Sequence, residues 1–236
     1  MDASPTALVL GASGTLGAAI ARALAARGYR LGLHAFEHPE RLPELAGART
    51  YRADFREPAQ VMALAEAFLK DFGRLDALVW AAGIAREAPV ATLREEQLRE
   101  VLAVDLTAPF LLAKAFARQF LRQRSGAFVV LGSHAGLDGR AGGAAYAMSQ
   151  SGLLALVKSL AREWGATGVR VNAVAPPFVA ASGLGRSATP AFIEAVQRKN
   201  VLRRDADPVE AVAEFVCELL DNQTASGQVF VLDSRF

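Results

Sequence analysis

The 236-residue sequence has little that would tie it to a membrane, a nucleic acid or a metal. Its one cysteine, Cys217, excludes a disulfide within the chain and lies in an apolar stretch, so we expect a core residue. Its 26 basic and 24 acidic residues give a net charge of +2, too balanced to indicate nucleic acid or an anionic membrane as a partner. The start has no basic leader segment and no apolar run that spans a bilayer, so we expect a cytoplasmic protein without a metal.

The sequence does have enough apolar residues for one large core. Hydrophobic residues make up 52% of the chain, and one α/β domain of this length is common. Short apolar runs predict buried parallel strands at 6–10, 30–34, 77–81, 127–131, 169–174 and 229–232, with a weaker one at 49–53. Helical patterns cover 16–27, 58–72, 95–122, 144–166 and 208–220, the last with Asp207 and Pro208 as N-cap and first helical residue.

This alternation of strands and helices predicts the fold class. Strand–helix–strand units with right-handed crossovers form a Rossmann-like, doubly wound parallel sheet of about seven strands with helices on both faces. We find no linker or repeat, and therefore expect a single dinucleotide-binding-type domain over residues 1–236.

A glycine-rich turn lies between the first predicted strand and the first helix. Its glycines allow a tight turn and let backbone N–H groups approach a pyrophosphate, which the helix N-terminus also attracts. We predict that this turn binds a dinucleotide; the alternative is that the glycines only allow close helix–strand packing. The predicted cofactor-binding residues here are Gly11, Ser13, Gly14, Leu16 and Gly17.

The turn after the second strand bears on the choice between NAD and NADP. A carboxylate there would hold the adenosine ribose hydroxyls of NAD, but the residue is Ala35, which somewhat favours NADP. No arginine lies in that turn to meet a 2′-phosphate, and Glu37 would repel one if it pointed inward. The sequence therefore does not decide between NAD and NADP.

Four further segments resemble motifs of the short-chain dehydrogenase/reductase family. Tyr146 and Gln150 stand where the family has Tyr-x-x-x-Lys, so the lysine is replaced. Ser133 precedes Tyr146 by thirteen positions, the family spacing of the catalytic serine and tyrosine. Asp105 replaces the asparagine of Val-Asn-Leu-Thr, and the segment Trp80-Ala81-Ala82-Gly83 keeps the second half of Asn-Asn-Ala-Gly.

The resemblance covers nearly the whole chain and implies roles for these residues. It implies catalytic roles for Ser133, Tyr146, Gln150 and Asp105. It implies cofactor contacts for Asp54, which matches the family acid near the adenine amino group, and for Ala82 and Gly83. A helix-capping role is the alternative for Asp54.

The two replacements change the expected chemistry of Tyr146. In the family, the lysine ammonium lowers the tyrosine pKa from about 10 and holds the nicotinamide ribose. Replacement of Asn/Lys⁺ by Asp105/Gln150 changes the local charge by about two units if Asp105 is ionised, which disfavours a tyrosinate. Tyr146 would then donate a proton as a neutral phenol but be a poor base, so reduction suffers less than oxidation. Gln150 could still donate hydrogen bonds to ribose hydroxyls.

Three hypotheses for the function stay open. The first is an atypical NAD(P)H-dependent ketoreductase, with a 3-oxoacyl thioester as the substrate class that the resemblance implies and residues 177–200 as the substrate loop. The second is a catalytically inactive subunit that stabilises an active paralogue and needs no cofactor. The third is a dinucleotide-binding sensor. By resemblance we expect a homotetramer, or a heteromer with the paralogue, assembled through the long helices 95–122 and 144–166 and the C-terminal strand 229–232.

Overall fold

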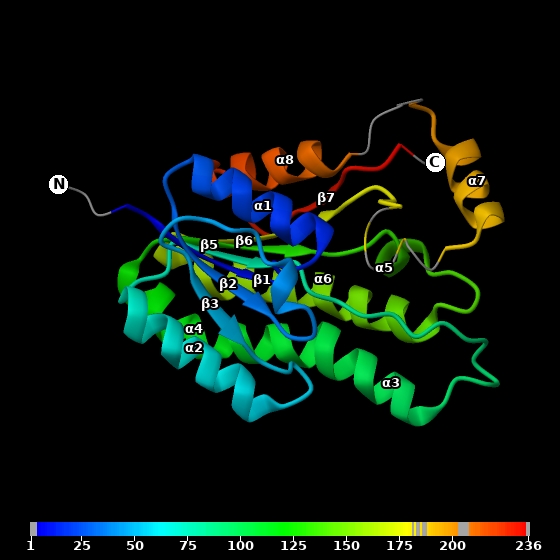
Figure 1. Ribbon diagram of the computed structural model, residues 1–236, viewed down its shortest axis with the longest axis horizontal. Coiled ribbons are helices and arrows are strands. Elements are labelled where there is room, and N and C mark those ends of the chain that lie inside the picture. The colour runs from blue at the N-terminus through cyan, green and yellow to red at the C-terminus, as the bar shows by residue number, and fades with distance from the viewer. Residues whose placement is uncertain (1–3, 181, 183–184, 186–187, 203–207, 235–236) are drawn as a thin grey trace.

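The protein is built on one sheet of seven parallel strands in the order β3-β2-β1-β4-β5-β6-β7 (Figure 1). The computed structural model describes residues 4–180, 182, 185, 188–202 and 208–234. The strands are β1 (Thr6–Leu10), β2 (Arg30–Ala35), β3 (Arg49–Arg52), β4 (Ala77–Trp80), β5 (Gly126–Leu131), β6 (Val169–Ala175) and β7 (Val229–Val231). The chain reverses its direction across the sheet between β1 and β4, the switch point where doubly wound folds bind ligands. The predicted fold class is confirmed.

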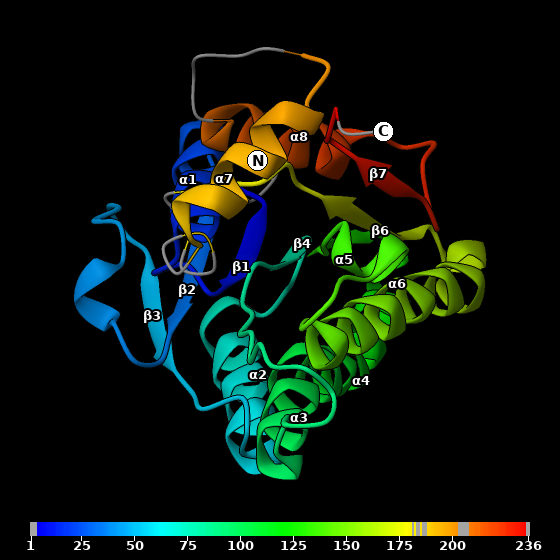
Figure 2. The same ribbon diagram turned by 90° about the vertical axis from the view of Figure 1, so that its right-hand side faces the viewer.

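Helices cover both faces of the sheet (Figure 2). One face is covered by α1 (Thr15–Ala26) and α8 (Val209–Asp221), and the other by α2 (Pro58–Phe72), α4 (Ala108–Gln123) and α6 (Ala144–Trp164). Within β1, alternate residues enter the two cores: Ala7 and Val9 face α1, whereas Leu8 and Leu10 face α2 and α4. None of the described helices is both long and apolar enough to cross a bilayer.

The prediction of one continuous helix over 95–122 was wrong. The segment consists of α3 (Glu95–Leu102), a π-helical stretch (Ala103–Thr107) and α4. Pro109 explains the interruption, because proline has no N–H to bond the carbonyl of Asp105 four residues earlier and its ring clashes with that carbonyl. The widened turn places Asp105 in the interior, where its side chain is fully buried.

Other departures lie in the connections. The β2–β3 connection has only a 3-10 turn (Pro39–Arg41), and two helices that we did not predict, α5 (Ala135–Asp138) and α7 (Pro190–Lys199), precede α6 and α8. Pro208 is the N-cap of α8 and not its first helical residue; the N-cap predicted at Asp207 lies outside the described residues. The substrate loop predicted at 177–200 is described only in part.

Candidate functional site

The glycine-rich turn is packed against the segment after β4. Gly11 has a φ of +77°, and a Cβ there would lie 2.7 Å from the Ala82 backbone. A Cβ on Gly17 would lie 2.3 Å from the Gly11 carbonyl oxygen. Neither position therefore accepts a side chain without moving the backbone. Ser13, Gly14 and Leu16 lie at the start of α1, where the first helical N–H groups have no partner within the helix.

His34 holds this turn from β2 and was not predicted. The Gly11 N–H donates to His34 Nδ1 at 3.3 Å, and the Ala12 N–H donates to the His34 carbonyl at 2.8 Å. Because Nδ1 accepts, Nε2 carries the proton and donates it to the Ala53 carbonyl at 2.9 Å. Burial lowers the pKa of His34 to about 4, and its ring stacks on Phe55 at 4.1 Å. A neutral imidazole thus fixes the first residue of the turn.

Two arginines from β3 and the turn after it flank the aromatic residue that follows β2. The parallel register pairs Ala35 with Arg52. The guanidinium groups of Arg52 and Arg56 lie 5.8 and 5.5 Å from the centre of the Phe36 ring, within the range of cation–π contacts. No arginine lies in the turn after β2 itself, but folding brings these two arginines from another segment to Phe36.

The two arginines differ in their other partners. Arg56 binds both carboxylate oxygens of Asp54, its Nη2 approaching Oδ2 to 2.6 Å, and its Nη1 lies 3.4 Å from Glu100. Arg56 holds the pKa of Asp54 below its usual value. Asp54 does not cap α2, whose N-cap is Glu57. Among the described residues Arg52 forms no ion pair, so it is the less neutralised cation.

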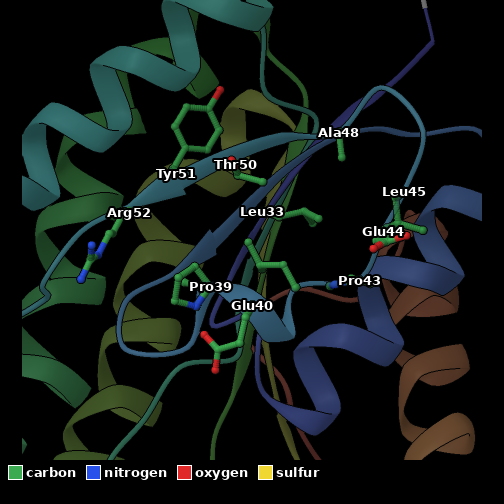
Figure 3. A pocket seen from close by; sticks show the side chains of 12 residues that line it. Leu33, Pro39, Glu40, Pro43, Glu44, Leu45, Ala48, Thr50, Tyr51 and Arg52 are labelled. Atoms are coloured by element: carbon green, nitrogen blue, oxygen red, sulfur yellow. The ribbon is translucent and has the colours of Figure 1, made fainter.

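Arg52 also lies at one end of a hollow between β2, β3 and the connection that joins them (Figure 3). The hollow has a volume of about 490 Å³ and is lined mainly by apolar residues, Leu33 and Ala35 on the sheet and Leu42 and Leu45 on the connection. It exists because this connection forms no long helix over that edge of the sheet.

The catalytic pair predicted from the sequence comes together at the ends of β5 and α6. Ser133 follows β5, and its hydroxyl lies near enough to the phenol of Tyr146 on α6 to favour the ionised form of that phenol. Ser133 Oγ also accepts the Ala135 N–H at 3.2 Å, which orients the hydroxyl. Burial, and after it the nearby Asp105, raise the pKa of Tyr146 to about 12, while Ser133 opposes the rise. Tyr146 is therefore a neutral phenol at neutral pH.

Asp105 and Gln150 contact one another beside this pair. Gln150 Nε2 lies 3.4 Å from Asp105 Oδ2, and the Ile84 N–H donates to Asp105 Oδ1 at 2.9 Å. Burial raises the pKa of Asp105 to about 7. Gly83 lies next to this carboxyl, since a Cβ there would be 3.6 Å from Asp105 Oδ1. The carbonyl oxygen of the Gln150 side chain is buried without a hydrogen-bond partner among the described residues.

Comparisons with known proteins agree with this arrangement. The family model described as "Enoyl-(Acyl carrier protein) reductase" matches residues 11–234. The chain belongs to the short-chain dehydrogenase/reductase family. It is 36% identical over 177 residues to the 3-oxoacyl-[acyl-carrier-protein] reductase FabG of Escherichia coli (strain K12), covering 73% of this chain and 72% of the relative.

Other relatives of this short-chain dehydrogenase/reductase carry different names. The D-threitol dehydrogenase of Mycolicibacterium smegmatis is 38% identical over 181 residues, which cover 73% of this chain and 69% of that protein. An uncharacterized oxidoreductase of Mycobacterium tuberculosis is 36% identical over 97% of this chain and 90% of its own. A solved dehydrogenase/reductase from Sinorhizobium meliloti 1021 superposes with a TM-score of 0.88 at 28% identity, covering 99% of this chain and 95% of that one.

The residues of this family member fit a nicotinamide dinucleotide, the family's usual cofactor. The glycine turn keeps its shape only with glycine at 11 and 17, because a Cβ at either position would meet backbone atoms, and the first N–H groups of α1 lie at this turn without partners within the helix. Gln150 stands at the sequence position of the family lysine, and its side-chain oxygen is buried without a hydrogen-bond partner among the described residues.

The structure also shows the surroundings of His134 and Cys217. His134, next to Ser133, pairs with Asp138 at 3.3 Å. Cys217 is buried in α8, as expected of a core residue, and burial raises the pKa of its thiol to about 11. The described residues contain no cluster of three or more metal-ligating side chains.

Proposed function

We propose that the protein is an atypical NAD(P)H-dependent ketoreductase that acts on a 3-oxoacyl thioester. The observation that carries the proposal is the proximity of the Ser133 hydroxyl to the Tyr146 phenol, close enough to lower the pKa of Tyr146. The similarity to 3-oxoacyl-[acyl-carrier-protein] reductases supports the substrate class. The similarity to D-threitol dehydrogenase makes a polyol the substrate to test beside it.

The protonation state of Tyr146 sets the direction of the proposed reaction. The reduced dinucleotide supplies the hydride when it is bound. Ser133 hydrogen-bonds the substrate carbonyl oxygen, and the Tyr146 hydroxyl donates its proton to that oxygen as negative charge develops. A phenol with a pKa of about 12 holds its proton at neutral pH, so Tyr146 serves as an acid and is a poor base. The proposed enzyme therefore favours reduction of a ketone over oxidation of an alcohol.

The test is oxidation of NADPH and NADH with an acetoacetyl thioester, and reduction of NAD⁺ and NADP⁺ with threitol. Wild type should reduce the thioester, Tyr146→Phe should lose the activity by two or more orders of magnitude (about 10² or more), and Ser133→Ala should lose less. Tyr146→Phe should keep the fold, because the phenyl ring fills the same space. No turnover by wild type with either substrate would refute the proposal.

For the cofactor we propose a preference for NADPH, with Arg52 as the residue that meets the 2′-phosphate. Arg52 is exposed at the end of β3 and less neutralised than Arg56. Arg52→Ala should weaken NADPH binding on the order of tenfold and leave NADH binding unchanged, since a hydrogen bond to a charged group is lost only for NADPH. Arg49→Ala, at the other end of β3, is the matched control. An equal effect of Arg52→Ala on both nucleotides would contradict this assignment.

A second candidate function is a catalytically inactive subunit that stabilises an active paralogue. The observation in its favour is the buried Asp105, which replaces the family asparagine and raises the pKa of Tyr146, while Gln150 replaces the lysine that lowers this pKa in the family. Large apolar side chains are exposed on the helices proposed for assembly: Phe110 and Leu121 on α4 and Met148 on α6. Absence of nucleotide binding and of turnover, with assembly intact in Tyr146→Phe, would favour this function over the reductase.

A further inference from the structure

Two connections near Tyr146 are joined to each other by an ion pair. The β4–α3 connection carries Glu87 and the α5–α6 connection carries Arg140, and both lie at the same end of the sheet (Figure 1). The guanidinium of Arg140 donates to a carboxylate oxygen of Glu87, which lies 53 positions away in the sequence. Beside this pair, the Ala88 N–H donates to the Gly142 carbonyl at 2.9 Å. One charged contact and one backbone contact therefore hold the two connections together.

The side chain of Arg140 lies over the start of α6. A Cβ on Gly143, the residue before α6, would lie 2.7 Å from Arg140 Cγ and 2.9 Å from its Nε. Tyr146 follows three residues later, in the first turn of this helix. The side chains of Arg140 and Glu87 are 32% and 50% exposed. The pair therefore borders the solvent beside the buried phenol and is open to a ligand.

Both charges of this pair act on Tyr146, in opposite directions. Arg140 lowers the pKa of the phenol and Glu87 raises it, so both lie near the reacting hydroxyl. An exposed ion pair contributes little to stability, and the bond between Ala88 and Gly142 already joins the two connections. Joining them is therefore a weak reason for an arginine at this position. Its consequence at the site is a group of N–H donors held beside Tyr146, with the charge balanced by Glu87.

A 3-oxoacyl thioester has a group that such donors recognise. Its second carbonyl, at C1, lies two carbons from the ketone, so the C1 oxygen stays close when Ser133 and Tyr146 bind the ketone oxygen. A guanidinium has five N–H groups in one plane and can bind a carboxylate and a further oxygen together. A carboxylate at C1 would meet the negative charge of Glu87 and be repelled. The pair therefore suits a neutral carbonyl at this place.

We infer that Arg140 is a substrate-binding residue that donates a hydrogen bond to the C1 carbonyl oxygen of the 3-oxoacyl group, and that Glu87 selects a neutral C1 carbonyl over a free 3-oxo acid. Arg140 thereby distinguishes a β-dicarbonyl substrate from a simple ketone. The inference rests on the proposed function, because it concerns the substrate of the same reaction.

The test compares three substrates with NADPH: the N-acetylcysteamine thioester of acetoacetate, acetoacetate itself and butanone. Arg140→Ala should lower kcat/KM for the thioester on the order of tenfold or more, because a hydrogen bond from a charged group is lost, and should lower it much less for butanone. Arg140→Lys should restore part of the loss, since its ammonium can donate to the same oxygen. Arg99→Ala is the matched control, because Arg99 is an exposed arginine that pairs with Glu95 on α3.

Glu87→Gln tests the selection by charge. It should raise kcat/KM for acetoacetate on the order of tenfold, because the carboxylate is no longer repelled, and should change the value for the thioester by less than about threefold. If the ion pair only held the two connections together, its loss would change all three substrates alike.

The outcomes separate this inference from the reductase proposal. An equal loss for the thioester and butanone in Arg140→Ala, an unchanged thioester, or no gain for acetoacetate in Glu87→Gln would show that the inference is wrong while the reductase proposal stands. If wild type does not reduce butanone, the NADPH affinity of Arg140→Ala, which should equal that of wild type, replaces it as the control. If wild type reduces none of the three substrates, both are wrong.

Discussion

The buried carboxyl of Asp105 makes a quantitative prediction about how the stability of the fold depends on pH. Its pKa is raised from 3.8 to about 7 on folding, mainly by burial. Its stabilising contribution is fully present below the unfolded pKa, decreases as the pH rises, and is lost above about pH 7. Asp105→Asn removes this titration, while the new amide can still accept the Ile84 N–H through its oxygen.

The size of the effect follows from the two pKa values. At about 1.36 kcal/mol per pKa unit, the contribution of the proton on Asp105 is about 2.7 kcal/mol at about pH 5 and near zero at about pH 8. The free energy of unfolding of Asp105→Asn minus that of wild type should therefore increase by about 2–3 kcal/mol between these pH values.

A second buried group, His34, also makes stability depend on pH, so wild type and Asp105→Asn have to be compared with each other. Its pKa is lowered from 6.5 to about 4 on folding, so its contribution is present above about pH 6.5 and is lost as the pH falls toward 4. Between about pH 5 and pH 6.5 the two groups change stability in opposite directions by about 1.4 kcal/mol per pH unit each. In wild type the two contributions nearly cancel, so its free energy of unfolding should change little over this range. Asp105→Asn keeps only the contribution of His34 and should become more stable as the pH rises.

The free energy of unfolding of both proteins can be measured at a series of pH values by urea unfolding, followed by the fluorescence of the buried Trp80 and Trp164. Glu66→Gln is the control, because this carboxylate is exposed on α2 and forms no ion pair among the described residues, so its loss should leave the curve of wild type unchanged. Parallel curves for wild type and Asp105→Asn over the whole range would show that Asp105 does not hold a proton in the folded protein.

Three further predictions concern the turn, the lysine position and assembly. Gly17→Val should abolish nucleotide binding in a folded protein, because its Cβ would lie 2.3 Å from the Gly11 carbonyl oxygen; a titration with unchanged affinity would contradict this. Gln150→Lys combined with Asp105→Asn should raise thioester reduction on the order of tenfold or more, since one pKa unit on Tyr146 corresponds to about 1.4 kcal/mol; no gain in NADPH oxidation would count against it. Sedimentation should show an oligomer at micromolar concentration, and a lone 25.0 kDa species would exclude it.

The fold could be predicted from the sequence because its signals are local. Seven short apolar runs alternate with helical patterns, and all seven strands formed within two residues of their predicted limits. The interruption of the helix over 95–122 was missed, although Pro109 is visible in the sequence. The apolar periodicity of the segment continues on both sides of Pro109. In sequence, a proline in the first turn of a new helix cannot be told from a proline that widens a turn within one helix.

The candidate site could be predicted only where a motif carries it. Ser133 and Tyr146 follow the family spacing, and the structure joins them. Arg52 and His34 were missed because their roles depend on tertiary neighbours: the β2–β3 register brings Arg52 to Phe36, and the β1–β2 pairing brings His34 to Gly11. A lone histidine inside an apolar strand next to the glycine turn was the one available signal for His34.

The replacements at positions 105 and 150 are best understood as one change. A lysine at 150 beside a carboxyl at 105 would form a buried ion pair, in which the ammonium is held by Asp105 and lost to Tyr146. A glutamine beside a neutral Asp105 has no charge to bury, and each side chain can satisfy the other. If Asp105 keeps its proton, the pair is neutral, one charge unit below Asn/Lys⁺; if Asp105 is ionised, the difference is two units. The site then keeps a neutral Tyr146, which suits protonation of a reduced carbonyl and disfavours the reverse reaction.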